Sequence, residues 1–194
     1  MLSGRRLDLV DPSPLDIEIA DIAHGLARVA RWNGQTHGEH AFSVAQHGLL
    51  VEALVQRLRP QASGTVLMLA LLHDAPEYVI GDMISPFKAV LGQAYRQVEH
   101  RLQVAVHRRF GLPAEPAATQ RRLIKQADII SAYLEAIWLA GFAEAEAADL
   151  FGRPQGVDCS EPALLALVTP WPVAEAEARF LARFHVLDEG RARS

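Results

Sequence analysis

The sequence predicts an all-α protein in which residues 1–194 form a single domain, a bundle of helices. Apolar residues recur at helical spacing along most of the chain, and no segment shows a convincing strand-like alternation of apolar and polar residues. The length of 194 residues suits one domain with a sizeable core. Half of the residues are hydrophobic, which excludes a disordered chain.

Each predicted helix follows from its own apolar period and its boundaries. Apolar side chains between Ile17 and Ala30 form the stripe of the first helix, and Pro60 ends the second. Ser85 and Pro86 open a long helix that stops at Gly111. The predicted helices span about residues 16–31, 40–58, 65–75, 85–110, 115–143, 161–168 and 173–187.

Composition excludes several classes of protein. The net charge of −4 argues against a partner that is polymeric nucleic acid. The single cysteine, Cys159, can form neither an internal disulfide nor a thiolate zinc site. The longest uninterrupted apolar run, residues 66–72, is far shorter than the ~20 residues that span a membrane, and the first residues lack the apolar region of a signal peptide. We therefore expect a cytoplasmic protein without a membrane partner.

The most informative motif is LLHDAPE, residues 71–77. It places His73 and Asp74 at the end of the most apolar predicted helix, where a carboxylate is costly unless something pairs with it. A divalent metal is one such partner. The alternative is a capping box in which Asp74 caps a new helix and Glu77 is its third residue. The two interpretations are compatible, and the motif alone leaves both open.

Two further candidates lie on other predicted helices. His47 sits among apolar residues, where a histidine is more often a core residue than a ligand. His40 is expected two turns earlier on the same helix, about 10.5 Å away, which suits a substrate contact in the same cleft. Asp128 is an isolated acid among apolar neighbours, and the alternative to a metal ligand is a local pair with Lys125 or Arg122.

The order His47, His73-Asp74, Asp128 on three helices resembles the HD-domain metal-dependent phosphohydrolases. The resemblance is closest to the bacterial 5′-deoxynucleotidase-like branch, and residues 33–42 are similar to those of a subgroup of uncharacterised HD proteins. It covers a core of about 31–133, with the C-terminal helices completing the bundle. The matching segments are RWNG (31–34), SVAQH (43–47), LLHDAPE (71–77), GDMISPFK (81–88) and KQADIISAY (125–133).

The resemblance implies one divalent metal ion, whether Mn, Co, Fe, Ni, Mg or Zn. Its ligands would be His47, His73, Asp74 and Asp128. Two nitrogens and two carboxylates leave octahedral positions open for water and a phosphate oxygen.

The resemblance also implies roles around that metal. Glu77 and Asp82 would be the catalytic acid and base, in either order. Arg31 and Trp32 would contact phosphate and sugar. Lys88 is expected as a second phosphate contact, and we add His40 as the substrate neighbour.

The expected function is that of a metal-dependent phosphohydrolase acting on nucleoside 5′-monophosphates or similar small phosphate esters through metal-activated water. The alternative from another class is a metal-bearing nucleotide-binding or sensor module with little turnover. A homodimer is expected because dimers occur in the resembling family. His100 and His107 could supply a second metal, but the arginines around them favour a solvated helix face.

Overall fold

The protein's structure, a computed structural model, describes residues 1–192 apart from the side chain of Ser85. This part of the chain is helical and contains no strand, so the predicted all-α fold is confirmed. Two short 3₁₀ turns, Pro14–Asp16 and Arg31–Gly34, accompany the α-helices. The helices are α1 (Ile19–Leu26), α2 (Val44–Leu58), α3 (Gly64–Leu71), α4 (Glu77–Ile80), α5 (Ser85–Arg109), α6 (Ala118–Trp138), α7 (Glu144–Phe151), α8 (Pro162–Val168) and α9 (Val173–Ala192).

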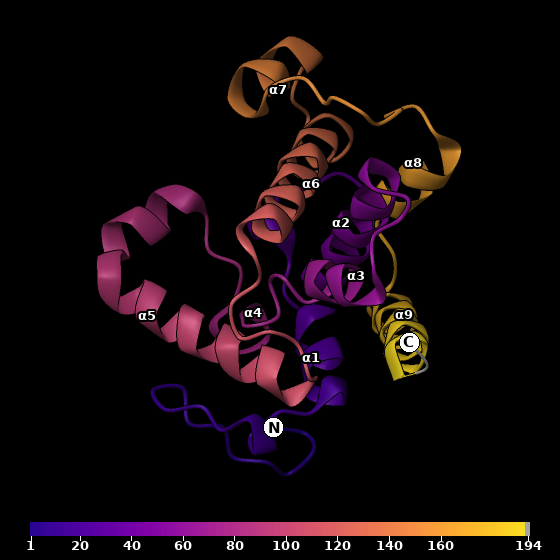
Figure 1. Ribbon diagram of the computed structural model, residues 1–194. Helices are drawn as coiled ribbons and strands as arrows, with labels where there is room; N and C mark the ends of the chain where they lie inside the picture. Colours follow the sequence, from indigo (N-terminus) through magenta and orange to yellow (C-terminus); the bar gives the residue numbers. More distant parts are fainter. Residues whose placement is uncertain (193–194) are drawn as a thin grey trace.

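Helix α2 lies at the centre of the bundle. It packs against α3, α6, α8 and α9, and its side chains from Val44 to Val55 are buried with few exceptions. Figure 1 shows α2 and α3 enclosed between α6, α8 and α9. Ser43 starts α2 by accepting a hydrogen bond from the backbone N–H of Gln46, and Ser63 does the same for α3 through Val66. One continuous apolar core therefore surrounds the helix that carries His47.

The first predicted helix ends early and the second begins late, because contacts between them turn the chain. α1 stops at Leu26, not at residue 31, and Ala30 then pairs with Ser43 in an isolated antiparallel bridge. The backbone N–H of Arg31 donates to the carbonyl of Phe42. Because Ser43 caps α2, the prediction that His40 lies two turns up the same helix is wrong.

The stretch after α3 also differs from the expectation. α3 ends at Leu71, so His73 and Asp74 lie in the turn between α3 and α4 instead of closing a longer helix.

The end of α6 differs from the prediction as well. α6 ends at Trp138, five residues before the predicted end, and Gly141 with a positive φ of 77° follows. The chain then forms α7, which was not predicted and which packs back onto α6.

Helix α5, which we call the arm, extends along one side of the bundle (Figure 1). It is broken at Gly92, whose φ of 72° and ψ of −144° only glycine adopts easily. The arm exposes large apolar side chains before this break, including Phe87 and Val90. Within residues 1–192, no helix is long and apolar enough to cross a membrane.

Candidate metal centre and active site

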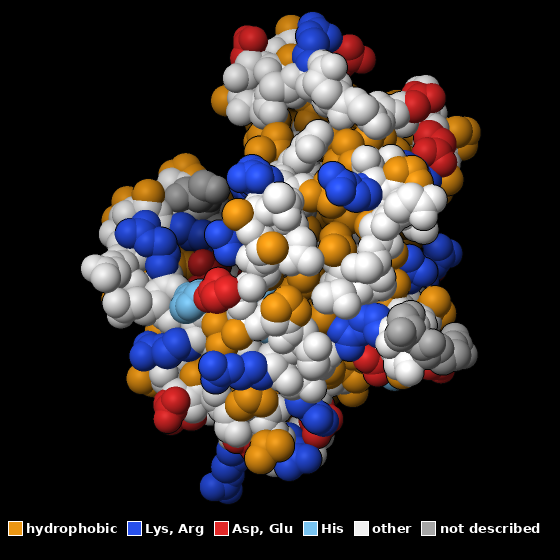
Figure 2. Space-filling model, in the orientation of Figure 1, with side chains coloured by type: hydrophobic (Ala, Val, Ile, Leu, Met, Phe, Trp, Pro, Cys, Tyr) orange, Lys and Arg blue, Asp and Glu red, His pale blue; other side chains and the backbone are white. Residues whose placement is uncertain are grey.

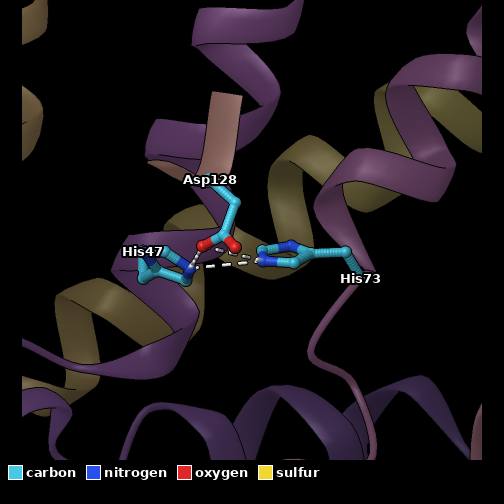
Figure 3. A group of neighbouring side chains, drawn as sticks. All are labelled: His47, His73 and Asp128. Atoms are coloured by element: carbon cyan, nitrogen blue, oxygen red, sulfur yellow. Dashed lines mark hydrogen bonds and ion pairs between the residues drawn. The ribbon is translucent and has the colours of Figure 1, made fainter. Parts of the chain in front are cut away.

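Three side chains from three parts of the chain converge on one point. His47 comes from α2, His73 from the turn after α3, and Asp128 from α6 (Figure 3). The two Nε2 atoms are 3.2 Å apart, and Oδ1 of Asp128 lies 3.4 Å from Nε2 of His47 and 4.0 Å from Nε2 of His73. Each residue offers one donor atom, and these atoms all lie within 4.8 Å of one another. This spacing suits ligands of a shared metal ion.

Asp74 faces the same point. Its Oδ2 lies 3.2 Å from Nε2 of His73 and 3.4 Å from Nε2 of His47. The capping alternative is not what the structure shows, because the N-cap of α4 is Pro76 and no side chain caps that helix. Asp74 contributes only its backbone carbonyl to the turn, where it accepts from the N–H of Glu77.

The outer nitrogens of both histidines are already in use. Nδ1 of His47 donates to Oε1 of Glu135 at 2.6 Å, and Nδ1 of His73 donates to the carbonyl of Ala70 at 2.8 Å. Nε2 of each ring faces the other ring and two carboxylates. Burial and the charge of Arg31 act to lower the pKa of His47, but the carboxylates of Glu135, Asp128 and Asp74 outweigh them and raise it, so in the metal-free protein Nε2 of His47 carries a proton that a metal would displace. Such a set of nitrogen and carboxylate groups is stabilised by a cation among them, so these residues fit a divalent metal with nitrogen and oxygen ligands.

Asp128 serves two partners. Its Oδ1 faces His47, while its Oδ2 accepts a hydrogen bond of 2.8 Å from Lys125, the local pair that the sequence offered as an alternative. Burial acts to raise the pKa of Asp128, but the hydrogen bond from His47 and the charges of the histidines outweigh it and lower the pKa below its usual range. The carboxylate is therefore ionised, as a metal ligand must be.

A cavity of about 530 Å³ opens beside these four residues. Figure 2 shows the hollow between the arm and the rest of the molecule, with Lys and Arg side chains around it. Asp74 and Asp128 line the cavity. The other residues that line it are Arg31, Trp32, Glu77, Asp82, Met83, Ile84, Pro86, Lys88, Lys125, Ile129, Ala132 and Phe151.

Two carboxyl groups in this cavity have raised pKa values. Glu77 is 2% exposed, its Oε1 lies 3.4 Å from Nζ of Lys88, and its Oε2 has no hydrogen-bond partner. Burial, followed by repulsion from the carboxylates of Asp74 and Asp82, raises the pKa of Glu77 to about 9. Burial also raises the pKa of Asp82, against the attraction of Arg31 at 3.6 Å. Glu77 therefore holds a proton at neutral pH.

Arg31 and Trp32 are fixed by a residue that the sequence reasoning missed. Oε2 of Glu135 accepts from Nε of Arg31 at 3.1 Å and from Nε1 of Trp32 at 2.9 Å. Glu135 lies seven residues after Asp128, two turns along the same face of α6, and this spacing was the available signal. The Trp32 ring also packs against Phe142 and Phe151, at centroid distances of 5.8 Å and 6.3 Å. Phe151 was missed because α7 was not predicted.

The structure brings Lys88 to the cavity but not His40. Lys88 lines it, and its Nζ lies 2.8 Å from Glu99 and 3.4 Å from Glu77. His40 lies in the loop before α2 and is not among the residues that line the cavity. The predicted contact between His40 and substrate therefore has no support in the geometry, because the helix that was to position it begins only at Val44.

The other two candidate histidines differ from each other. His100 is exposed and lies 3.2 Å from the carboxylate of Glu115. His107 is buried, which contradicts the expected solvated face, and its ring bonds Gln103 and the carbonyl of Ala114. Within residues 1–192, only the group at His47 has the spacing of a metal site.

Comparison with known proteins gives one family match and two relatives. Residues 20–146 match the family described as 5′-deoxynucleotidase YfbR-like. The chain is 56% identical over 189 residues to an uncharacterised protein of Rhodobacter capsulatus, covering 96% of this chain and 93% of that protein. It is 35% identical over 115 residues to the uncharacterised protein YfdR of Escherichia coli K12, covering 59% and 57% of the two chains. The chain therefore belongs to the YfbR-like 5′-deoxynucleotidase family of the HD-domain superfamily.

Proposed function

We propose that the protein is a divalent-metal-dependent phosphohydrolase that releases phosphate from nucleoside 5′-monophosphates or similar small phosphate esters. One observation carries the proposal. Four metal-ligand side chains, His47, His73, Asp74 and Asp128, meet at the wall of a cavity that also contains an arginine and two carboxyl groups of raised pKa. Membership of a family of 5′-deoxynucleotidase-type phosphohydrolases supports the same reaction class.

The residues divide the work of an in-line displacement at phosphorus. His47, His73, Asp74 and Asp128 would hold a divalent cation, which would supply Lewis-acid polarisation and an activated water when bound. Arg31 uses its Nε and Nη2 for Glu135, so Nη1, which lies 3.6 Å from Asp82, is the edge left to face a phosphate oxygen. Lys88 of α5 adds a second positive charge to the cavity lining. These groups stabilise the charge that develops on the phosphoryl oxygens.

Glu77 and Asp82 move the protons. Since Glu77 is protonated at neutral pH, we assign it the donation of a proton to the leaving ester oxygen. Asp82, whose negative charge Arg31 favours, takes the proton from the attacking water. The two carboxyl groups therefore have opposite tasks, set by their surroundings.

The apolar part of the cavity lining suits the alcohol that leaves. It includes Trp32, Ile129, Ala132 and Phe151. Such a wall accommodates a sugar and a planar base better than a second charged group. This favours a nucleotide over an inorganic polyphosphate.

The test is a screen of purified protein for phosphate release from mononucleotides and other phosphate esters, with Mn²⁺, Co²⁺, Mg²⁺, Ni²⁺ and Zn²⁺. Asp74→Ala serves as the blank, and Asp149→Ala, an exposed aspartate on α7, is the matched control. We expect metal-dependent release in the wild type and in Asp149→Ala, and none in Asp74→Ala.

Release that does not exceed the Asp74→Ala blank with any metal would overturn the proposal. If the same protein still bound the metal and a mononucleotide, the binding-module alternative would replace it. Release that survives both Glu77→Ala and Asp82→Ala would instead refute the roles assigned to these two carboxyl groups.

A further inference from the structure

Glu135 lies at the meeting point of the metal ligands and the cavity wall. Its side chain is completely buried in α6. Oε1 accepts the hydrogen bond of 2.6 Å from Nδ1 of His47, and Oε2 accepts those from Nε1 of Trp32 and Nε of Arg31. A single carboxylate is thus bonded both to a predicted metal ligand and to two of the residues predicted to contact substrate, Arg31 and Trp32.

Only an ionised carboxylate satisfies this set of donors. Three side chains point N–H groups at the two oxygens of Glu135, and none of them offers an acceptor there. A glutamine in its place has one oxygen and one NH₂ group. Whichever way that amide is turned, the NH₂ group faces at least one N–H donor and leaves it without a partner.

The consequence differs for the two orientations of such an amide. With NH₂ toward His47, Nδ1 must become the acceptor, and the ring proton moves to Nε2, the atom that faces the predicted metal. With NH₂ toward Trp32 and Arg31, both lose their common acceptor. The first orientation disturbs the metal site, and the second leaves Trp32 and Arg31 without the hydrogen bonds that hold them in the cavity wall.

Trp32 needs such support because its backbone is strained. Its φ is 55° and that of Asn33 is 51°, so two consecutive residues with side chains occupy the left-handed region. Residues with side chains persist in this region only where their surroundings hold them. The hydrogen bond to Glu135 and the packing on Phe142 and Phe151 supply that hold.

We propose that Glu135 is a positioning residue that sets the affinity of the metal site through His47 and at the same time holds Arg31 and Trp32 in place for substrate. The second half of this inference rests on the proposed phosphohydrolase function. The first half concerns metal binding alone and is independent of turnover.

The test compares Glu135→Gln with Glu52→Gln. Glu52 is a matched control, because it is also buried on a central helix and bonded to an arginine, Arg183, but does not touch the site. Co²⁺ is titrated by calorimetry, and the visible absorption of the bound Co²⁺ reports its ligand environment. We expect ~10–100-fold weaker Co²⁺ binding and a changed spectrum for Glu135→Gln, as is typical of partners behind a ligating histidine. Glu52→Gln should keep the wild-type affinity and spectrum.

Two further readouts complete the design. On whichever phosphate ester the wild type hydrolyses, Trp32→Phe, which removes one N–H donor to Glu135, should raise KM more than it lowers kcat. If Glu135→Gln fails to fold, Glu135→Asp keeps the charge but withdraws both oxygens, and we expect weaker Co²⁺ binding with an altered spectrum there as well.

Wild-type Co²⁺ affinity and an unchanged spectrum in Glu135→Gln, or in Glu135→Asp where only that variant folds, would overturn the inference. So would a loss of affinity of the same size in Glu52→Gln, since the effect would then be one of general stability. A wild type that binds Co²⁺ but releases no phosphate would refute the proposed function and leave the metal-binding half of this inference to be decided by the same titrations.

Discussion

The two sides of the cavity are built in different ways. One side, which we call the ligand wall, consists of α2, the turn after α3, and α6, and its side chains are tied to buried partners such as Glu135. The other side is the arm, which is broken at Gly92, exposes Phe87 and Val90, and contributes Lys88 to the cavity. The residues predicted to bind metal are on the buried side, where the packed core limits their movement.

The two sides of the cavity therefore suit different tasks, one the binding of metal and the other the exchange of substrate. Metal ligands need fixed positions, and a packed wall with hydrogen-bonded outer nitrogens gives them. A substrate must enter and leave, which an exposed and weakly packed helix permits more easily than a core helix does. From this difference we expect substitutions on the ligand wall to have large effects on activity or stability, and substitutions on the arm to have small ones. Four substitutions test this expectation.

The largest effect is expected for His73→Ala on the ligand wall. It removes one of two nitrogen donors, and since a catalytic metal contributes several kcal/mol, phosphate release should fall by ~10³-fold or more. Elemental analysis should show the loss of bound metal. His185→Ala, an exposed histidine on α9, is the control and should keep both. Full metal content in His73→Ala would contradict the assignment of this ligand.

Glu77→Gln comes next, because Glu77 lies between the two sides and contacts Lys88 of the arm. Removing a proton-transferring carboxyl group should lower kcat by ~10²–10⁴-fold while the metal stays bound. The wild type should also lose activity at alkaline pH, because burial raises the pKa of Glu77 and the proton donor ionises as the pH rises through it. A variant that keeps this alkaline loss would show that another group causes it.

A pair of aliphatic truncations tests the packing of the two sides directly. Leu54→Ala on α2 removes a fully buried side chain and should lower the free energy of unfolding by about 2–5 kcal/mol. Val90→Ala on the arm, where the side chain is 80% exposed, should change it by less than about 0.5 kcal/mol. Urea denaturation measures both, and equal losses would mean that the arm is packed as firmly as the core.

A further prediction concerns stability against pH in the metal-free protein. The pKa of Glu77 is about 9 when folded and near its usual 4.5 when unfolded, so the unfolded chain gives up this proton first as the pH rises. Stability should therefore fall between about pH 4.5 and pH 9, and Glu77→Gln should remove part of that fall. Thermal unfolding with a chelator at pH 5 and pH 8.5 tests this, with Glu144→Gln, an exposed glutamate, as the control. The explanation would be wrong if Glu77→Gln were no more stable than the wild type at pH 8.5.

The sequence by itself determined the helical class and the group at the centre of the site. Apolar periods are a local property, so most helices were predicted within a few residues. His73 and Asp74 were found because a charged pair beside a buried helix needs a partner, and the order of motifs then added His47 and Asp128. The structure brings all four together, although their role as metal ligands stays a prediction.

Only the tertiary structure decided what surrounds that group. The partnership of Glu135 with Arg31 and Trp32 joins residues more than a hundred positions apart, and no local period encodes such a contact. The Ala30–Ser43 bridge precedes α2, so the helix that was expected to carry His40 begins only at Val44, and α7 brings Phe151 to Trp32. Local patterns fix which residues form helices, whereas the packing of distant helices fixes which side chains meet.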